Sequence, residues 1–522
     1  MIGAILSAIG NLWLPLAIAL LFFYVLYLKK RAQYFKKRGI PSPTAQSLFL
    51  GHLKEKERDG QWFVRYRDWE DKYGRTFGIY EGGHRLIVTS DLDILDDVFN
   101  KQFSKFHARK VTPDFAADQA TMPGAHLFMS EGARWKRLRA LVAEVFTTGK
   151  VRSAEAVAND TIRAVMRQIE KDMEKSDIVD LKPHFLSMSL DLIERLSLGR
   201  PRTRIGTETT DHFGETLLAL FADKGVSTSW IRSFFAGIYE FRRVSSFLFR
   251  LYSMSSLHRF VTMQKKLREI YARKSQDKGD RPKDFVNHLM EARIDKSDIE
   301  DYGKTVNDRR VQKKLTAEEI MSTMAMFLVA GYDTTANTVT YLCYRLAQNE
   351  DVQEKLYEEV SSHIQSTEDI TMSTVQSMQY LDWCVKECLR MDPHATGALE
   401  RRCTETTTVG KANKLEIEKG VCVGANTYSI HFNEQLWPEP YKFRPERFSP
   451  EESAKRHPLA WQPFGMGPRI CVGMRLALLE VKLAIVHTLK EFSLHVCDET
   501  NFKCSGNITV SPETMKLRVE KR

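Results

Sequence analysis

Apolar residues recur at the three- and four-residue spacing of α-helices along much of the chain. The longest run extends from Thr316 to about Gln348, another follows Met474, and Val151–Arg200 holds two or more shorter ones. Residues three and four positions apart share one helix face, so each run predicts an amphipathic helix. At 1.5 Å per residue, the helix from Thr316 would be roughly 50 Å long and would cross a whole domain.

Alternation and turn signals predict strands in two places. Thr76–Tyr80 and Arg85–Thr89 flank the turn Glu81-Gly82-Gly83, which is typical of a hairpin. Val421–Ile430 has the composition of a further strand, and Gln61–Tyr73 has the pattern of an aromatic-rich helix. The chain therefore combines local strand pairs with the longer helices.

The long central run has a strong start and a weak middle. Thr316-Ala-Glu-Glu319 is a capping box, in which two side chains bind the backbone N–H groups of a helix start. The middle holds Ala330-Gly331-Tyr-Asp333-Thr334-Thr335, although glycine and threonine weaken a helix interior. A local opening of the helix there would free groups to bind water, and an acid beside a hydroxyl suits proton delivery. The alternative is a helix that merely tolerates its threonines.

The first 28 residues carry no charged side chain, and Leu12–Leu28 is almost wholly apolar. A membrane-spanning helix needs about 20 apolar residues. Six basic residues lie within Lys29–Arg38, and such a flank stays on the cytoplasmic side. We expect a signal-anchor transmembrane helix at 1–28, a basic and proline-rich hinge at 29–45 and a cytosolic domain at 46–522. A cleavable signal peptide is the alternative, but no basic region precedes the apolar run and no small-residue cleavage site follows it.

Composition narrows the classes of function. The 522 residues carry a formal net charge of +10, and the cluster Lys29–Arg38 supplies six of those charges. Such a local flank favours a membrane surface as partner and gives no support for nucleic-acid binding. Eight scattered cysteines without paired spacing favour thiols in a reducing compartment. Cys384 and Cys388 lie one helical turn apart, which leaves a zinc pair as an alternative to buried core thiols.

The densest chemistry lies in Phe464-Gly-Met-Gly-Pro-Arg469-Ile-Cys471-Val-Gly473, a glycine-rich loop that leads into the helix from Met474. A helix N-terminus favours negative charge, so we expect Cys471 to be a thiolate, the form that binds a metal. Glycines let the backbone approach a flat ligand, and Arg469 is placed to meet an acidic group on it. A buried cysteine in a tight turn is the alternative. A phosphate loop is excluded because its third glycine would have to replace Ile470.

Two further pairs lie at helical spacing. Trp135 and Arg139 are four residues apart, so their indole N–H and guanidinium project together, and both are donors suited to a carboxylate. Glu387 and Arg390 can pair on one helix face, although such pairs are common on surfaces. An ordinary amphipathic helix is the alternative for each pair.

Together these segments resemble the cytochrome P450 superfamily. The pattern Phe-x-x-Gly-x-Arg-x-Cys-x-Gly, the Trp-x-x-x-Arg pair, the Ala-Gly-x-Asp-Thr string, Glu-x-x-Arg and Phe443-Arg-Pro-Glu-Arg447-Phe fall in the family's order across nearly the whole chain. The spacing around the long helix and the string Leu399-Glu-Arg-Arg-Cys403 most resemble those of the animal microsomal group, which oxidises drugs and steroids. The resemblance implies a mainly α-helical fold with a small β-rich subdomain, preceded by the N-terminal transmembrane helix.

The resemblance also implies roles for single residues. Cys471 would be the axial thiolate ligand of the iron of haem b, and Asp333 and Thr334 would be the acid–alcohol pair that manages protons during O2 activation. The residues expected to hold the haem, mostly at its propionates, are Trp135, Arg139, Arg401 (or Arg402), Phe464, Arg469 and, as the nearest match in its region, Arg109. The expected structural network is Glu387, Arg390 and Arg447. The candidates for the substrate pocket are Phe128, Met326, Phe327, Ala330, Ala395, Leu399 and Ile508.

The activity implied by the resemblance is that of a microsomal monooxygenase. It would insert one oxygen atom from O2 into a lipophilic substrate such as a xenobiotic, a steroid or a fatty acid. Electrons would come from the NADPH–cytochrome P450 reductase, with cytochrome b5 as a further donor, at the cytosolic face of the endoplasmic reticulum membrane. Lys136, Arg137 and Arg475 are candidates for docking the reductase, with solvated surface charge as the alternative.

Two other functions stay open at the level of sequence. A haem-thiolate isomerase or dehydratase would rearrange a lipid peroxide without a reductase, and a non-catalytic haem sensor would only bind the cofactor. The Asp333–Thr334 pair argues against both, since neither needs to activate oxygen. Activity without NADPH would support the first, and failure to consume NADPH with any lipophilic substrate would support the second.

Overall fold

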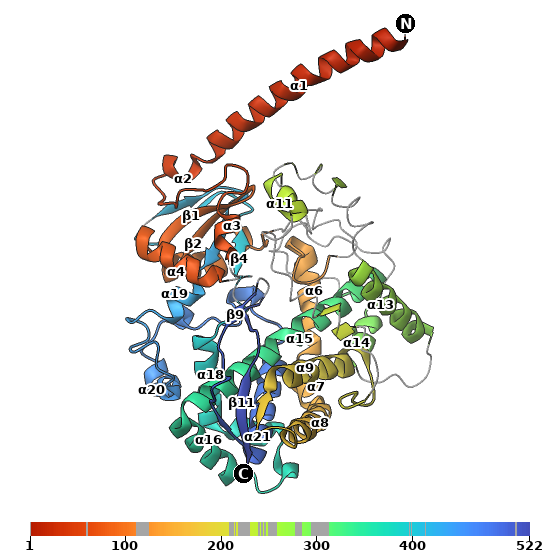
Figure 1. Ribbon diagram of the computed structural model, residues 1–522, viewed down its shortest axis with the longest axis vertical. Helices are drawn as coiled ribbons and strands as arrows, with labels where there is room; N and C mark the ends of the chain where they lie inside the picture. Colours follow the sequence, from red (N-terminus) through yellow and green to blue (C-terminus); the bar gives the residue numbers. More distant parts are fainter. Residues whose placement is uncertain are drawn as a thin grey trace.

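Helices make up most of the molecule, and its two termini lie at opposite ends (Figure 1). The computed structural model describes residues 2–522 except for 59–60, 111–124, 208–212, 215, 218–229, 239–240, 242–243, 245–246, 249–257, 277–283, 294–312, 396, 398, 413 and 507–508. The mainly helical fold with small β-sheets is confirmed.

The helices of the described residues are α1 (Ile2–Arg31), α2 (Tyr34–Lys37), α3 (Leu53–Lys56), α4 (Trp62–Tyr73), α5 (Leu92–Asp96), α6 (Gly132–Val145), α7 (Thr148–Ser153), α8 (Glu155–Met173), α9 (Leu181–Leu198), α11 (Trp230–Gly237), α13 (His258–Gln276), α14 (Phe285–Glu291), α15 (Ala317–Gln348), α16 (Glu350–His363), α17 (Met372–Ser377), α18 (Gln379–Met391), α19 (Thr427–His431), α20 (Pro450–Ser453) and α21 (Met474–Glu491). The strands are β1 (Thr76–Glu81), β2 (His84–Thr89), β3 (Ile178–Asp180), β4 (Glu400–Arg402), β5 (Thr407–Val409), β6 (Leu415–Ile417), β7 (Cys422–Ala425), β8 (Phe492–His495), β9 (Cys504–Ser505), β10 (Ser511–Pro512) and β11 (Lys516–Lys521).

The four-stranded sheet joins segments that are far apart in the sequence. Its order is β1-β2-β7-β4, so the β1–β2 hairpin pairs with strands from the C-terminal third of the chain. The predicted hairpin is confirmed to within one residue at its turn. The predicted strand Val421–Ile430 is wrong beyond Ala425, where α19 follows. The Asn426 side chain donates to Ser429 Oγ at 2.8 Å and to a Glu70 oxygen of α4 at 2.6 Å, which turns the chain away from the sheet.

Helix α1 extends away from the rest of the molecule (Figure 1). Its apolar side chains Leu20, Leu21 and Phe23 are more than half exposed. Among the residues that the structure describes, no helix combines the length and the apolarity that crossing a bilayer requires, so the expected transmembrane helix is not confirmed.

Helix α15 is the long helix that the sequence predicts. Its capping box is present: the Glu319 N–H donates to Thr316 Oγ1 at 3.2 Å, and the Thr316 N–H donates to Glu319 Oε2 at 3.1 Å. The helix continues without interruption to Gln348, so the expected local opening in its middle is not seen. A side chain at Gly331 would come within 2.9 Å of Ile193 of α9, so this glycine is needed for close helix packing.

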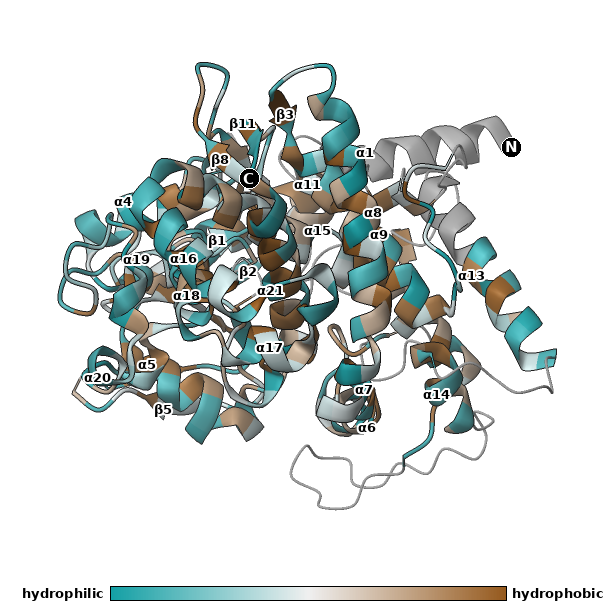
Figure 2. Cartoon of the chain, turned by 90° about the horizontal axis from the view of Figure 1, so that it is seen from below, coloured by the Kyte–Doolittle hydropathy of each residue, from teal (hydrophilic) through white to brown (hydrophobic). Residues whose placement is uncertain are grey.

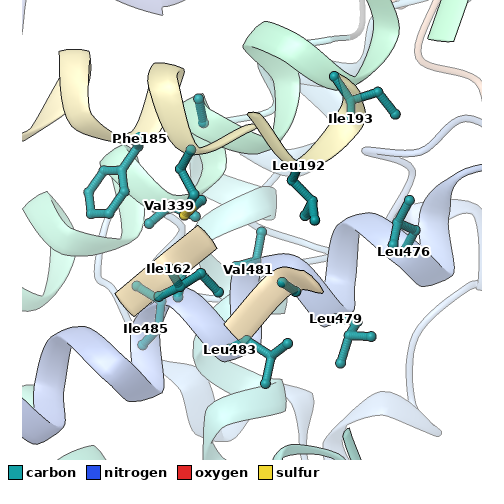
Figure 3. Close-up of a cluster of buried hydrophobic side chains, with 14 of the residues drawn as sticks. Ile162, Phe185, Leu192, Ile193, Val339, Leu476, Leu479, Val481, Leu483 and Ile485 are labelled. Carbon is teal, nitrogen blue, oxygen red and sulfur yellow. The ribbon is translucent and has the colours of Figure 1, made fainter. Parts of the chain in front are cut away.

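The largest core cluster surrounds α15. Figure 3 shows side chains from four helices meeting there: Ile162 of α8, Phe185 and Leu192 of α9, Val339 of α15, and Val481 and Ile485 of α21. Hydrophobic residues are concentrated along α21, whereas rim helices such as α20 are largely hydrophilic (Figure 2). The core therefore packs α21 against α15. Because α21 begins just after the cysteine loop, this packing also fixes the position of the loop.

One acidic side chain lies inside this core. Glu480 of α21 is buried, and its Oε1 accepts a hydrogen bond from Ser189 Oγ of α9 at 2.9 Å. Burial raises the pKa of Glu480 from 4.5 to about 8, and the Ser189 hydrogen bond opposes this only in part. The folded protein therefore keeps this carboxyl group protonated at neutral pH.

We expect Glu480→Gln to stabilise the fold at neutral pH and to have no such effect in acid. The pKa of Glu480 is higher in the folded state than in the unfolded state, so the free energy of unfolding falls as pH rises from about 4.5 to about 8. Glutamine does not titrate, so in the variant this decrease should be absent. The free energy of unfolding should differ on the order of 3 kcal/mol at pH 7, measured by denaturant titration across pH. Glu358→Gln, at an exposed position of α16, is the control. A pH-independent difference would contradict the prediction.

Candidate active site

The loop that carries Cys471 is shaped by its own backbone and by two neighbouring segments. The Cys471 N–H donates to the Phe464 carbonyl at 2.9 Å, which closes the loop ahead of α21. Gly467 has φ +68°, and a side chain there would lie 1.9 Å from the Phe99 carbonyl oxygen. Gly465 has φ +76° and lies against Leu399. These two glycines are therefore required by the conformation of the loop and by its neighbours.

Cys471 is the exposed member of the eight cysteines, and Cys384 and Cys388 are buried core thiols. Cys471 is exposed as a residue, yet the surrounding protein atoms raise the pKa of its thiol by desolvation. Hydrogen bonds from the backbone of α21's first turn and the charges of Arg139 and Arg109 lower the pKa but do not outweigh burial. The thiolate form of Cys471 therefore stays a prediction. A metal cation at the sulfur would displace the proton.

Arginines from four parts of the chain gather at this loop: Arg109, Arg139, Arg401 and Arg469. Burial lowers the pKa of each guanidinium, and for Arg109 the value is about 10. The charges of Arg109 and Arg469 also lower the pKa of Arg401. The charge of Arg139 lowers the pKa values of Arg109 and Arg469 in the same way. Positive charges buried together repel one another, so this place suits a ligand with more than one negative charge.

Arg469 is held by main-chain carbonyls and an aromatic ring. Its Nε donates to the His107 carbonyl at 2.7 Å, and its guanidinium carbon lies 4.7 Å from the centre of the Trp135 ring. Arg139 Nη1 donates to the Ile470 carbonyl at 2.8 Å. The structure therefore brings Trp135 and Arg139 of α6 to the two residues that precede Cys471.

Arg401 and Arg402 have different surroundings. Arg401 is 1% exposed, its guanidinium lies 4.5 Å from the centre of the Phe99 ring, and its Nε and Nη2 make no hydrogen bond to any part of the chain that the structure describes. Arg402 forms an ion pair with Glu131. The geometry therefore favours Arg401 over Arg402 as the residue that meets a ligand.

One face of α15 is accessible although the helix crosses the core. Ala330 is exposed, and Met326 and Thr334, four residues to either side on the same face, are partly exposed. The Thr334 hydroxyl donates to the Ala330 carbonyl at 2.7 Å, which leaves its oxygen as an acceptor on this face. The accessible face thus carries small and apolar side chains and one hydroxyl group.

Asp333 is buried on another side of α15. Its Oδ2 accepts from Asn337 Nδ2 at 2.7 Å, its Oδ1 accepts from Ser511 Oγ at 3.1 Å, and Thr509 is a third donor. Successive helical residues point about 100° apart, so the acid and the alcohol, although adjacent in sequence, face different surroundings. The acid–alcohol pair is thus divided between the accessible face and a buried polar cluster.

His394 is also buried, and the sequence did not predict that it would interact with Asp333. Its Nδ1 lies 3.1 Å from the Asp392 carbonyl oxygen, and burial lowers the pKa of the ring while the charge of Asp333 raises it. A single histidine in a loop has no spacing signal that could have pointed to α15.

Glu387, Arg390 and Arg447 come together as a buried network. Arg390 donates to both carboxylate oxygens of Glu387, at 2.7 and 2.9 Å, and Arg447 Nε donates to Glu387 Oε1 at 2.9 Å. Arg447 also donates to the Pro438 carbonyl at 2.9 Å. These contacts join α18 to the segment that precedes the cysteine loop.

The residues predicted to line the substrate pocket lie in different surroundings. The Phe327 ring packs 5.7 Å from Phe146 and 5.9 Å from Phe285 in the core, so its place in the pocket stays a prediction. Phe128 lies beneath the Arg109 guanidinium, 4.0 Å from ring centre to carbon. Ala395 is half-buried, Leu399 lies against Gly465, and Ile508 falls outside the described residues.

Arg137 is wrong as a docking residue for a reductase. It is buried, and its two terminal nitrogens donate to the Glu319 carboxylate at 2.7 and 2.8 Å. Arg475 is exposed and Lys136 is half-buried, so both stay predictions.

Comparison with known proteins finds one family along nearly the whole chain. The family model described as cytochrome P450 matches residues 41–518. The Caenorhabditis elegans protein cytochrome P450 CYP13A2 is 30% identical over 94% of this chain and 95% of its own length. Cytochrome P450 cyp-13B1 of the same organism is 30% identical over 95% of this chain and 97% of its own length. These names state the family and no substrate.

We expect Arg401→Gln to weaken haem retention more than Arg402→Gln does. Arg401 has two buried guanidinium nitrogens that no described residue binds, whereas Arg402 forms an ion pair with Glu131. Loss of a group that orients a metal cofactor lowers its affinity about 10- to 100-fold. Haem content per folded protein, measured after gel filtration, checks this. The same loss in both variants would contradict the assignment.

Proposed function

The chain belongs to the cytochrome P450 family and is therefore a haem-thiolate monooxygenase, and we propose that its substrates are lipophilic small molecules. The observation that carries the assignment of the site is the gathering of buried arginines beside an accessible cysteine. Haem b has an iron, which can bind the thiolate of Cys471. It also has two negatively charged propionates, which can pair with the arginines.

The residues around the loop fit this cofactor. Cys471 offers an accessible sulfur, Arg401 has two buried nitrogens that no described residue binds, and Ala330 presents a small side chain to a flat ligand. When bound, haem would supply the iron that takes O2 and the oxidising chemistry. Cys471 would hold the iron, and Arg109, Arg139, Arg401 and Arg469 would neutralise the propionates.

The residues of α15 are suited to handling protons and substrate. The Thr334 hydroxyl lies on the accessible face and can hold a water or a proton there, while Asp333 keeps an acid behind it among hydroxyl and amide donors. Met326 and Ala330 make the rest of this face apolar, which supports a xenobiotic, steroid or fatty-acid type of substrate.

We further propose attachment to the endoplasmic reticulum membrane through α1, with the folded domain in the cytosol. The exposed apolar side chains of α1 and the basic cluster Lys29–Arg38 support this. An NADPH-dependent reductase in the same membrane would then supply electrons, with cytochrome b5 as a further donor. Arg475, exposed next to the cysteine loop, is a candidate contact for such a partner.

Reconstitution tests the function directly. The purified protein with NADPH–cytochrome P450 reductase, presented with steroids, fatty acids and drug-like amines, should consume NADPH and O2 and release a product with one oxygen atom from O2. Rearrangement of a lipid peroxide without NADPH would indicate an isomerase instead. No NADPH consumption with any substrate would indicate a haem-binding sensor.

Two variants separate the roles of sulfur and hydroxyl. Cys471→Ala should lose the red-shifted carbonyl spectrum of a thiolate-ligated ferrous haem, because the sulfur ligand is gone. Thr334→Ala should keep that spectrum but form product at least roughly tenfold less per NADPH, with more hydrogen peroxide, because proton delivery is impaired. An unchanged carbonyl spectrum in Cys471→Ala would sink the assignment of the ligand.

A further inference from the structure

Two arginines of the site lie opposite each other on paired segments. Ala108 and Arg402 form an antiparallel bridge, in which the Arg402 N–H donates to the Ala108 carbonyl at 2.8 Å. Continuing this register places Arg109 opposite Arg401, and Lys110 opposite Glu400. Opposite residues of an antiparallel pair project to one side and successive residues alternate, so the two arginines share one side and the lysine–glutamate pair shares the other.

Placing Arg109 opposite Arg401 is unfavourable by itself. Arg401 is buried and Arg109 is partly buried, and like charges directly opposite each other on paired strands destabilise the pairing. Burial is the main reason that the pKa of Arg401 lies well below its ordinary value. The charge of Arg109 lowers it further, as expected for two like charges that repel each other. Something outside the arginine side has to keep the two segments in register.

A buried ion network lies on the other side of the same pairing. Lys110 Nζ lies 2.5 Å from Glu400 Oε2 and 2.5 Å from Glu81 Oε2, and Lys56 Nζ lies 2.5 Å from Glu81 Oε1. These side chains are all less than 15% exposed. Two lysines and two glutamates balance in charge, and Tyr66 adds a hydrogen bond to Glu81 at 3.2 Å.

The network ties the arginine segments to fixed elements. Glu81 ends β1, Glu400 begins β4, and Lys56 ends α3. Burial lowers the pKa of Lys110, but the carboxylates of Glu400 and Glu81 raise it to a net value above the ordinary one, so the lysine stays charged and paired. The segment of residues 108–110 is thereby joined to the sheet on the side away from the arginines.

We propose that the network of Lys56, Glu81, Lys110 and Glu400 positions Arg109 and Arg401 side by side so that together they bind the two carboxylates of the haem. This inference rests on the proposed haem site. The four network residues act through the arginines, and are positioning residues. They hold the two guanidiniums together before the ligand arrives, so the ligand's negative charges meet an arrangement that needs no rebuilding.

The test is the rate at which the holoenzyme loses haem to an excess of myoglobin apoprotein, followed by absorbance. Glu400→Gln and Lys110→Met should release haem on the order of tenfold faster than the parent protein, since each removes one partner that orients the arginines. Lys110→Arg keeps the charge and should restore a rate close to that of the parent. The carbonyl spectrum should stay that of a thiolate ligand in all variants, because Cys471 is untouched.

Controls separate positioning from general stability. Glu499→Gln breaks an exposed ion pair with Lys516, 2.6 Å long, and should leave the rate of haem loss unchanged. Leu494→Ala in β8 weakens the buried core elsewhere, and its thermal midpoint gives the comparison for an equally destabilised protein. If Glu400→Gln loses haem no faster than Leu494→Ala at the same thermal stability, the proposal is overturned.

A further variant guards against misfolding. Lys110→Met combined with Glu400→Gln removes both charges and leaves the Lys56–Glu81 pair, so it avoids a lone buried charge. It should fold and still lose haem faster than the parent, and a rate equal to that of the parent would overturn the proposal. A parent protein that binds no haem through Cys471 would instead refute the proposed function.

Discussion

Burying several positive charges beside one sulfur atom is the constraint on which the rest of this structure depends. Guanidinium groups lose hydration free energy when buried and also repel one another. The charges of Glu400 and Glu131 raise the pKa values of Arg109 and Arg469, but burial and the other arginines lower them by more. Arg469 is surrounded by main-chain carbonyls and the Trp135 ring, and Arg401 lies over the Phe99 ring. Carbonyl oxygens and aromatic faces stabilise a cation without cancelling its charge, so the place stays positive and selects an anionic ligand.

Elsewhere in the described residues, two buried groups of charged side chains pair with opposite charges. Arg390 binds Glu387 through two parallel hydrogen bonds, and Lys110 lies between Glu400 and Glu81. These pairs join segments that are far apart in the sequence, α18 to Arg447 in one case and the segment of Lys110 to β1 and β4 in the other. The described charged residues therefore include balanced groups that hold the fold and, around Cys471, a cluster of arginines that suits an anionic ligand.

Helix α15 connects the core to the site through its different faces. Gly331 allows α9 to approach, Ala330 lies on the accessible face, and Asp333 is held by a polar cluster that includes the C-terminal hairpin. A helix that bends or opens would lose these relations, and the capping box and the surrounding core keep it straight. The weak helix formers in its middle are tolerated because tertiary packing on α9 compensates for their low propensity.

The sequence alone determined the features that depend on neighbours along the chain. It predicted the capped central helix, the β1–β2 hairpin, the cysteine loop and the family's motifs, since helix caps, turns and spacing are local. It did not predict that Asp333 and Thr334 face different surroundings, that Arg137 pairs with Glu319, or that burial raises the pKa of the Cys471 thiol. Those outcomes depend on which distant segments pack together. Burial and neighbouring charges set the pKa and the accessibility of a side chain, and both arise only when the chain has folded.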